Sequence, residues 1–373
     1  MRDNVFSEVK GKLGFGYMRL PMENGSFDTS SVNDMADRFM ELGFSYFDTA
    51  FLYTGSEEAL RESIVKRYPR DSFQIATKIA IMLGLKKPED QRAQFDISLS
   101  RLGVDFVDFY LIHGLSDNFI HIADELDTWS YMRAMKAEGK AKHIGFSFHG
   151  TPELLEKVLT EHPEFEFVQL QINYLDWENP EVKSRELYEI ARRHNKPIVI
   201  MEPCKGGLLA SEDSAAGKLM SDYNPDSSVA SWAFRYVLSL EGVEVALSGM
   251  GEPYQLEDNA KTANNFTPVT AQELEVIDEA VKAINSTPRV PCTSCKYCVD
   301  HCPKKIAIPQ FIKLHNDYLV HQEKSSVQYH YGSAKKFGTP PSECIKCRLC
   351  ETHCPQHIAI ADVLEEFVKV MED

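Results

Sequence analysis

The chain has 373 residues, of which 43% are hydrophobic, enough for one large domain with a small one or for two domains of medium size. Its formal net charge of -16, without any block of basic residues, argues against binding to nucleic acid or to an anionic membrane surface. No apolar run reaches the length that spans a bilayer, and no signal-peptide pattern opens the chain, so we expect a cytoplasmic protein.

Residues 4–27 contain several glycines and one proline, which favour turns. We expect a short hairpin here, followed by a first strand that ends near Gly14-Phe15-Gly16. From residue 31 a regular alternation of helical and strand patterns begins, with Thr151 as the expected N-cap of one helix. Strands are predicted at 45–49, 72–77, 106–112, 142–147, 167–172, 198–202 and 243–248, and helices at 31–42, 57–67, 88–102, 124–138, 152–159, 184–195, 227–240, 254–261 and 270–284.

These strands are short and almost continuously apolar, as parallel strands buried on both faces are. Eight strand–helix units in about 255 residues favour an α/β fold of the TIM (β/α)8 barrel type. An open, doubly wound sheet is the alternative. The polar stretch at 285–288 indicates a domain boundary, so we expect a barrel domain at 1–285 and a second domain at 286–373.

Ionisable side chains collect where the predicted strands end. Strand two ends at Asp48, with Tyr53 in the next loop, strand three ends at Lys78, and strand four ends at His113. Each residue alone has a structural explanation, for example Asp48 as a helix cap. A barrel, however, would bring all four to its active face, the C-terminal end of the strands. Polar residues of the later strands would lie at the same end, namely Ser147, Gln171, Asn173, Glu202, Ser248 and Gly249.

These four residue types can protonate a carbonyl oxygen. A tyrosine hydroxyl has an ordinary pKa of about 10, so a tyrosine that acts as a general acid near neutral pH needs its pKa lowered by roughly 3 units, or about 4 kcal/mol. An ammonium group about 4 Å away supplies a term of that order at an effective dielectric constant near 20. We expect Asp48 to keep Lys78 charged, and His113 to orient the carbonyl oxygen beside Tyr53.

Residues 10–265 resemble the aldo-keto reductases. This resemblance implies an NAD(P)H-dependent reductase of small aldehydes or ketones, with Tyr53 as the acid. The matching motifs are Gly14-Phe15-Gly16-Tyr17-Met18-Arg19-Leu20-Pro21, Phe47-Asp48-Thr49-Ala50 with Tyr53 and Gly55-Ser56-Glu57, Ala76-Thr77-Lys78, Leu111-Ile112-His113, Ile144-Gly145-Phe146-Ser147 and Gly206-Gly207-Leu208-Leu209.

The resemblance also implies where the nucleotide binds. Ser147 and Gln171 are expected to hold the nicotinamide carboxamide, and residues 248–259 the adenine ribose and phosphate end. The candidate contacts for the nucleotide are thus Ser147, Gln171, Glu202, Ser248, Gly249, Gln255 and Asn259.

The chain departs from the family pattern at three places. Phe148 stands where an Asn usually follows the strand-five Ser, and Met201 with Glu202 stands where an aromatic ring often stacks on the nicotinamide. Gln255 stands where a basic residue commonly meets a 2'-phosphate, although Lys261 is close in sequence. The motifs therefore do not distinguish NADPH from NADH.

Eight of the nine cysteines lie in two runs near the C-terminus, which favours metal ligation over a disulfide framework. The ninth, Cys204, is expected to be a small hydrophobic residue. Both runs have the spacing Cys-x-x-Cys-x-x-Cys-x-x-x-Cys-Pro. The candidate metal ligands are Cys292, Cys295, Cys298 and Cys302 in the first run and Cys344, Cys347, Cys350 and Cys354 in the second.

This spacing is that of bacterial ferredoxins with two clusters, in which the fourth Cys of a run ligates the other cluster. The short spacings let three thiolates of one loop surround a cubic cluster, while the fourth comes from the next helix or from the other run. Zinc is the alternative, because it also takes four cysteines, but zinc ribbons usually present paired Cys-x-x-Cys units. We therefore expect two [4Fe-4S] clusters.

Helical patterns at 309–321, 326–336 and 358–371 complete this region. It resembles the helical dicluster ferredoxins that serve as electron-transfer modules in larger oxidoreductases, and the ferredoxin-like extension of some bacterial and archaeal aldo-keto reductases. Three roles for the clusters stay open: they serve a separate redox partner, such as a flavoprotein or a ferredoxin, they are structural, or a further cofactor lies between them and the nicotinamide.

Three functions fit these observations. The first is a carbonyl reductase with an attached electron-transfer module, which the complete set of Asp48, Tyr53, Lys78 and His113 favours. The second is an iron-sulfur electron-transfer protein whose barrel binds a nucleotide or partner without simple carbonyl reduction. The third is a nucleotide-sensing barrel with structural clusters. Nicotinamide delivers two electrons as a hydride, whereas a cluster usually takes one, and no flavin motif is recognisable in the chain.

Overall fold

The structure is a computed structural model that describes residues 5–23, 25–334 and 339–372. The chain forms two compact units. The first runs up to Cys204 and includes Asp226–Glu273, and the second comprises Lys205–Pro225 and the chain from Leu274 onward.

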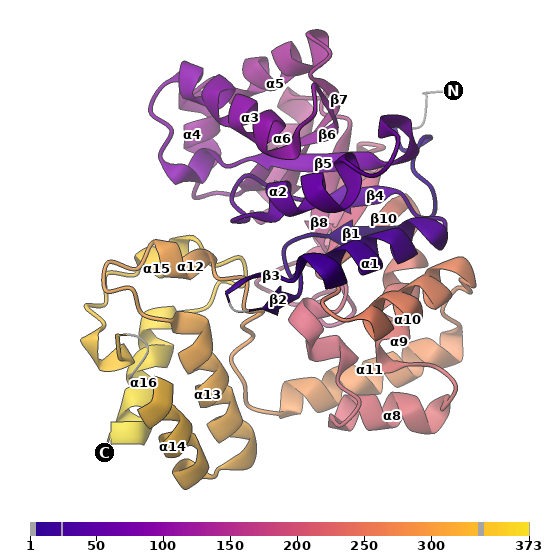
Figure 1. The fold of residues 1–373 in the computed structure, drawn as a ribbon. Coiled ribbons are helices and arrows are strands. Elements are labelled where there is room, and N and C mark those ends of the chain that lie inside the picture. Colours follow the sequence, from indigo (N-terminus) through magenta and orange to yellow (C-terminus); the bar gives the residue numbers. More distant parts are fainter. Residues whose placement is uncertain (1–4, 24, 335–338, 373) are drawn as a thin grey trace. The chain divides into compact units, whose positions relative to one another are not determined.

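Eight parallel strands close into a barrel in the first unit, as predicted (Figure 1). Each strand pairs with two neighbours in the order β1-β10-β9-β8-β7-β6-β5-β4, and β4 pairs with β1 to close the ring. Nearly every strand residue is buried, because the barrel interior lies on one face and the helices on the other. The strands are β1 (Leu13–Gly16), β4 (Tyr46–Asp48), β5 (Gln74–Ile79), β6 (Val107–Leu115), β7 (Ala141–Phe148), β8 (Phe167–Gln171), β9 (Ile198–Met201) and β10 (Val243–Ser248).

Helices follow the strands and cover the outside of the barrel (Figure 1). Thr151 caps α6 as predicted, since its hydroxyl accepts a hydrogen bond from the Leu154 N–H at 3.3 Å. The helices are α1 (Thr29–Glu41), α2 (Ser56–Leu60) with the π-helix η1 (Arg61–Val65), the short 3-10 helices η2 (Arg70–Ser72) and η3 (Ile81–Leu83), α3 (Pro88–Leu102), α4 (Ile120–Glu125), α5 (Thr128–Ala137), α6 (Pro152–Glu161), α7 (Ser184–Arg193), α9 (Val229–Leu238) and α10 (Pro253–Asn264).

The prediction for the first 27 residues was wrong in its order. The hairpin, formed by β2 (Met22–Glu23) and β3 (Ser26–Phe27), follows β1 instead of preceding it. Before β1, Phe6 lies in the barrel at the N-terminal end of the strands, where its ring stacks on Phe109 with centroids 4.8 Å apart. An aromatic side chain therefore fills the end of the barrel opposite the predicted active face.

The helix predicted at 124–138 was also wrong, because the structure breaks it into α4 and α5. Asp127 lies between them in the left-handed region, with φ of 48°, and its carboxylate accepts a hydrogen bond from the Ser130 N–H. An Asp in this conformation ends one helix and caps the next. The helix α8 (Ala215–Tyr223) was not predicted, since only Ala216, Gly217 and Met220 of it are buried and the apolar stripe is narrow.

Three helices of the second unit pack around a small core of their own. The Tyr331 ring lies 5.2 Å from the Phe367 ring and 5.9 Å from the Phe311 ring, measured between centroids. The predicted helices of this region are present, although residues 335 and 336 lie outside the described residues. The elements of this unit are η4 (Lys205–Ala210), α8, most of α11 (Ala271–Ser286), α12 (Tyr297–Asp300), α13 (Ile308–His321), α14 (Lys324–Ala334), η5 (Pro341–Glu343), α15 (Leu349–Thr352) and α16 (Ile360–Glu372).

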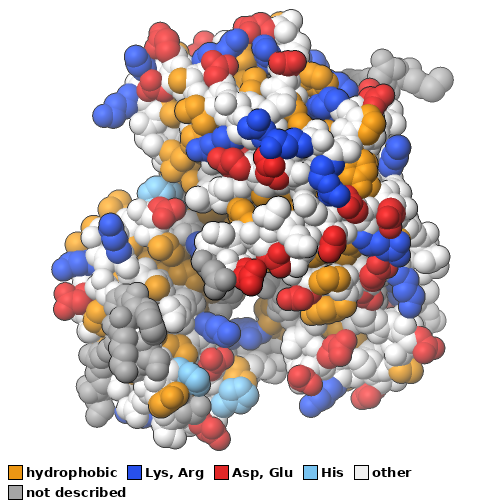
Figure 2. All heavy atoms as spheres, viewed as in Figure 1, with side chains coloured by type: hydrophobic (Ala, Val, Ile, Leu, Met, Phe, Trp, Pro, Cys, Tyr) orange, Lys and Arg blue, Asp and Glu red, His pale blue; other side chains and the backbone are white. Residues whose placement is uncertain are grey.

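Charges of both signs are interspersed over the face that Figure 2 shows, in spite of the net charge of -16. Many of them form exposed ion pairs, such as Arg185 with Glu178 at 2.8 Å. Among the described residues, no helix is both long and apolar enough to cross a bilayer.

Candidate active site and metal centres

A buried ion pair forms the base of the candidate active site. Lys78 is the fifth residue of β5 and Asp48 is the last residue of β4, and the two strands are adjacent. The Lys78 Nζ donates to Asp48 Oδ2 at 2.6 Å and to the Thr49 carbonyl at 2.8 Å. Burial raises the pKa of the Asp48 carboxyl and lowers the pKa of the Lys78 ammonium, while the ion pair opposes both shifts. Each charged group therefore depends on the other.

Tyr53 and His113 lie beside this ion pair. The Lys78 Nζ is 5.5 Å from the centroid of the Tyr53 ring, and the rings of Tyr53 and His113 meet edge to face with centroids 5.5 Å apart. Burial, and then the positive charge of Lys78, hold the pKa of His113 well below its usual range. His113 is therefore a neutral imidazole at neutral pH, with one N–H to donate. The structure thus brings the four predicted residues together.

Polar side chains continue around the same end of the barrel. Ser147, at the end of β7, accepts a hydrogen bond from the Gly114 N–H at 2.8 Å, which leaves its hydroxyl proton to donate. Gln171, at the end of β8, donates a hydrogen bond from Nε2 to Asp176 at 2.8 Å. Its amide oxygen is the acceptor that it can offer to a ligand. A donor and an acceptor at neighbouring strand ends match the two halves of a carboxamide.

Asp176 was not predicted as a site residue, although it orients the side-chain amides of Gln171 and Asn173. Its carboxylate is fully buried and accepts hydrogen bonds from the amide groups of both Gln171 and Asn173, each at 2.8 Å. Asn173 also donates to the Glu202 carbonyl at 3.1 Å. Its side-chain oxygen accepts from the backbone N–H of Asp176 in an Asx-type turn. The Asn-x-x-Asp spacing after a buried strand was the available signal.

The predicted adenine end of the site is assembled around the start of α10. Asn259 donates to the Ser248 hydroxyl at 3.0 Å, so these two predicted residues lie together. Gly249 packs closely against Arg19, and a Cβ added at Gly249 would lie 3.1 Å from the Arg19 Cδ. Gln255 accepts hydrogen bonds from the Gly251 and Glu252 N–H groups as part of a capping box. Its side chain therefore caps the N-terminus of α10.

The remaining predicted contacts lie at the ends of their strands. Glu202 follows β9 with a φ of 56°, and its carbonyl is held by Asn173. Phe148 is buried beside Phe146, and Cys204 packs against the hydrophobic core, as expected of a small apolar residue. A second buried carboxylate was missed: Glu57 accepts from the Thr77 hydroxyl at 2.8 Å and pairs with Arg101 at 3.3 Å.

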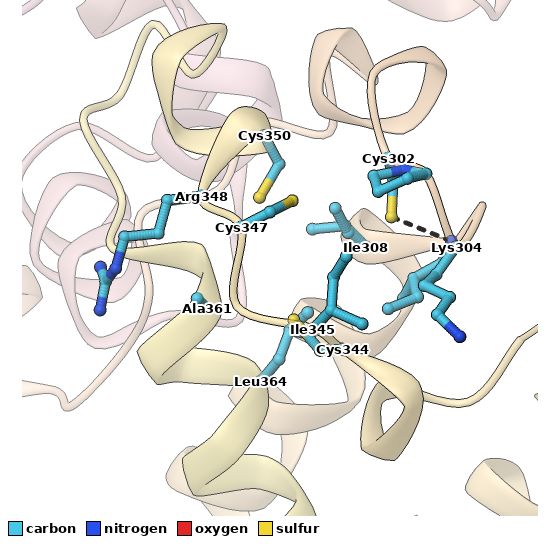
Figure 3. Close-up of a pocket in the computed structure, with 12 residues that line it drawn as sticks. Cys302, Lys304, Ile308, Cys344, Ile345, Cys347, Arg348, Cys350, Ala361 and Leu364 are labelled. Atoms are coloured by element: carbon cyan, nitrogen blue, oxygen red, sulfur yellow. Dashed lines mark hydrogen bonds between the residues drawn. The ribbon is translucent and has the colours of Figure 1, made fainter.

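The two cysteine runs line two separate cavities, and each run contributes its last cysteine to the cavity of the other. The second cavity is drawn in Figure 3, where Cys302 approaches the thiols of the second run from a different segment. The Ile306 N–H donates to its sulfur at 3.5 Å, the dashed line of Figure 3. Cys292, Cys295, Cys298 and Cys354 line the first cavity, and Cys302, Cys344, Cys347 and Cys350 line the second.

The donor set of each cavity fits a metal cluster. Burial, and then the neighbouring thiols, raise the pKa of Cys298, and burial and its neighbours raise the pKa of Cys350 to about 12. Four crowded thiols in an apolar wall become thiolates only where positive metal charge offsets their repulsion.

The two runs are related by an internal repeat in the sequence. His301 and His353 each precede the last cysteine of a run, and their rings stack in parallel, with centroids 3.4 Å apart and an interplanar angle of 2°. The short helices α12 and α15, which carry the third cysteine of each run, occupy equivalent positions in the repeat.

Comparison with known proteins matches the two parts of the chain to two families. Residues 12–282 match the model of the aldo/keto reductase family, and residues 291–359 match that of the 4Fe-4S dicluster domain. The NADH-specific methylglyoxal reductase of Escherichia coli K12 is 26% identical over 236 residues, which cover 57% of this chain and 68% of that protein. Aldo-keto reductase str7 of Strobilurus tenacellus is 30% identical over 221 residues, which cover 56% of this chain and 62% of that protein.

Solved structures show the same fold. The holo form of aldo-keto reductase AKR11C1 from Bacillus halodurans has a TM-score of 0.59 at 24% identity, and covers 73% of this chain and 92% of its own. An aldo/keto reductase from Klebsiella pneumoniae in complex with NADP and acetate has a TM-score of 0.59 at 20% identity, and covers 72% and 90%. The chain therefore belongs to the aldo/keto reductase family and carries a C-terminal 4Fe-4S dicluster domain.

Proposed function

We propose that the protein reduces an aldehyde or ketone with NADPH or NADH, and that it holds two [4Fe-4S] clusters. The observation that carries the first part is the buried ion pair of Lys78 and Asp48 beside Tyr53 and a neutral His113. A buried ion pair is weak evidence for stability, because the cost of removing its charges from water offsets much of their attraction. A charged lysine next to a tyrosine ring is instead suited to support a phenolate.

In the proposed reaction, the bound nicotinamide supplies a hydride to the carbonyl carbon. Tyr53 donates its hydroxyl proton to the carbonyl oxygen, so that one hydride and one proton convert the carbonyl to an alcohol. Lys78 stabilises the phenolate that remains, and Asp48 keeps Lys78 protonated. His113, being neutral, donates a hydrogen bond to the carbonyl oxygen and holds it beside Tyr53.

Residues at the other strand ends would orient the nucleotide. Ser147 would donate to the carboxamide oxygen of the nicotinamide, and Gln171, fixed by Asp176, would accept from the carboxamide nitrogen. At the adenine end we propose Ser248, Gly249, Gln255 and Asn259 as contacts, with Glu202 near the nicotinamide. The hydrogen bond between Ser248 and Asn259 supports a preformed surface there.

For the metal centres we propose crossed ligation. Cys292, Cys295, Cys298 and Cys354 would hold one cluster, and Cys302, Cys344, Cys347 and Cys350 the other, in agreement with the cavities that they line. The clusters would transfer single electrons to or from a redox partner, or serve as structural centres. We place the boundary between the two domains at residues 285/286.

The test is turnover by the full-length protein, purified and assayed under anaerobic conditions. We expect loss of NADPH or NADH absorbance with at least some members of a broad panel of aldehydes and ketones, and about eight irons per chain. No oxidation of either nucleotide by any carbonyl would overturn the reductase proposal. In that case the second function, an electron-transfer protein whose barrel only binds nucleotide or partner, would take its place. Zinc in place of iron would overturn the cluster proposal.

A further inference from the structure

The two cysteine cavities differ at several repeat-related positions, and one of them is the residue that follows Cys-Pro. Each run ends in Cys-Pro, and the next residue is Lys304 after the first run and Gln356 after the second. Both residues line the cavity at which they lie. The Lys304 side chain is 41% exposed, and its ammonium lies 3.5 Å from Glu343 at the surface. Gln356, in contrast, is only 6% exposed. A buried amide in a cavity wall requires hydrogen-bond partners.

Lys205 supplies one of these partners. Its Nζ donates to Gln356 Oε1 at 2.9 Å, and the lysine is 4% exposed. Lys205 begins η4, four positions after the end of β9, and belongs to the same compact unit as Gln356. The backbone beside it is fixed: Lys205 has a φ of 44°, and a Cβ added at Gly206 would lie 2.9 Å from the Thr293 Cα. Thr293 in turn lines the first cavity.

The chemistry of lysine determines which way the amide faces. An ammonium group has only donors, so the oxygen of the Gln356 amide must face Lys205. The group that Gln356 then presents on its other side is an NH₂ donor, and this residue lines the cavity of Cys292, Cys295, Cys298 and Cys354. Hydrogen bonds to the sulfur atoms of a cluster, and nearby positive charge, stabilise the reduced cluster, which carries one more negative charge.

We propose that Lys205 is a positioning residue which acts through Gln356 to raise the reduction potential of the cluster held by the first cavity. The inference rests on the proposed cluster assignment. It also gives the two clusters different roles, because the repeat-related Lys304 is exposed to solvent and cannot hold a buried donor in the same way. The segment that follows β9 in the chain is thereby linked to one cluster and not to both.

The test is a redox titration of the full-length iron-loaded protein, followed by electron paramagnetic resonance. Cys354→Ser and Cys302→Ser first identify which one-electron step belongs to which cavity; we call these the Cys354 step, for the first cavity, and the Cys302 step, for the second. Lys205→Met is then expected to lower the reduction potential of the Cys354 step alone. The expected shift is about 59 mV, which corresponds to about a tenfold lower ratio of reduced to oxidised cluster at a fixed potential. Gln356→Leu should produce the same shift, and Lys205→Arg, which keeps the donor, should retain the wild-type value.

The matched control is Lys304→Met, which removes a lysine beside the other cavity and is expected to leave the Cys354 step in place. The inference is overturned if Lys205→Met and Gln356→Leu leave both steps unchanged while the protein still holds about eight irons. It is also overturned if they move the Cys302 step. Zinc in the wild type overturns the cluster assignment itself, so the two failures are distinguishable. A purely structural role would lower the melting temperature without changing either potential.

Discussion

The barrel site and the cysteine cavities assemble their reactive groups in opposite ways. In the barrel, Asp48, Lys78 and His113 come from three successive strands, and the two that are closest in sequence, Asp48 and Lys78, are 30 positions apart. In the cysteine unit, three thiols of each cavity lie within seven consecutive positions, and only the fourth comes from far away. The barrel site thus depends on the whole fold, whereas each cavity depends mainly on one loop.

The two sites also differ in how charge is stabilised. The barrel buries a cation and an anion that support each other, so the site is charged before any ligand binds. The cavities bury thiols whose pKa values are raised, and these require the charge of a metal. A single substitution should therefore affect chemistry or stability in the barrel, but metal content in the cysteine unit. Four substitutions test this contrast, beginning with the largest expected effect.

Cys354→Ala should remove one of two clusters. The first cavity would lose its fourth thiolate, and we expect the iron content to fall from about eight to about four per chain. Cys204→Ala is the control, because Cys204 packs against the hydrophobic core of the first unit and its loss should leave the iron content unchanged.

Crossed ligation makes a further prediction about pairs of substitutions. Adding Cys292→Ala to Cys354→Ala should not lower the iron content further, because both thiols line one cavity. Adding Cys302→Ala to Cys354→Ala should remove the remaining iron, because Cys302 lines the other cavity. The reverse pattern, measured by iron analysis, would show that each run holds its own cluster.

Tyr53→Phe should abolish the proton transfer while leaving the fold intact. We expect kcat for carbonyl reduction to fall by about 10²–10⁴-fold, because the phenyl ring has no proton to donate. Nucleotide binding, measured by fluorescence titration, should remain, since Tyr53 is not among the proposed nucleotide contacts. Tyr329→Phe is the matched control, because that ring is 75% exposed and belongs to the second unit. Equal activity of the two variants would contradict the role of Tyr53.

Lys78→Met should destabilise the barrel by leaving Asp48 as an unpaired buried charge. The expected loss in the free energy of unfolding is about 3–5 kcal/mol. Adding Asp48→Asn should recover much of this loss, because the remaining amide is neutral. Lys66→Met, which breaks the exposed ion pair with Glu62, should cost only about 0.2–1 kcal/mol. Unfolding by denaturant gives the free energy of unfolding of the wild type, the two single variants and the double variant. Similar losses for Lys66→Met and Lys78→Met would refute the burial argument.

Much of the architecture could be predicted from the sequence because the barrel repeats one pattern eight times. Short apolar strands and amphipathic helices each repeat a local signal, so an error in one boundary does not change the fold. Errors arose where one residue decides the outcome. The φ of 48° at Asp127 splits a predicted helix, and Phe6 lies in the barrel where a hairpin was predicted before β1.

The candidate site was predictable to the extent that topology places it. The carboxyl ends of parallel strands converge, so Asp48, Lys78 and His113 could be grouped from the sequence alone. Side-chain hydrogen bonds were not predictable in this way, because they depend on rotamers and loop geometry. The capping role of Gln255 and the contact of Lys205 with Gln356 belong to this second class, since neither follows from spacing.

The smallest expected effect concerns pH and His113. Because burial lowers the pKa of this imidazole in the native state, the unfolded chain takes up its proton as the pH falls through about 6.5, while the folded chain does not. The unfolded state then binds more protons, so His113 reduces the free energy of unfolding as the pH falls below about 6.5, by up to about 1.4 kcal/mol per pH unit. His113→Gln removes this proton uptake and should flatten the pH dependence by that amount.

Tryptophan fluorescence can follow this effect in the barrel alone, because Trp129, Trp177 and Trp232 all belong to the first unit. Unfolding by denaturant at several values between about pH 7 and about pH 5 gives the slope for each protein. The same slope in wild type and His113→Gln would mean that His113 binds a proton in the folded state. In that case the imidazole beside Tyr53 would be a second cation, and the barrel site would no longer rest on a single ion pair.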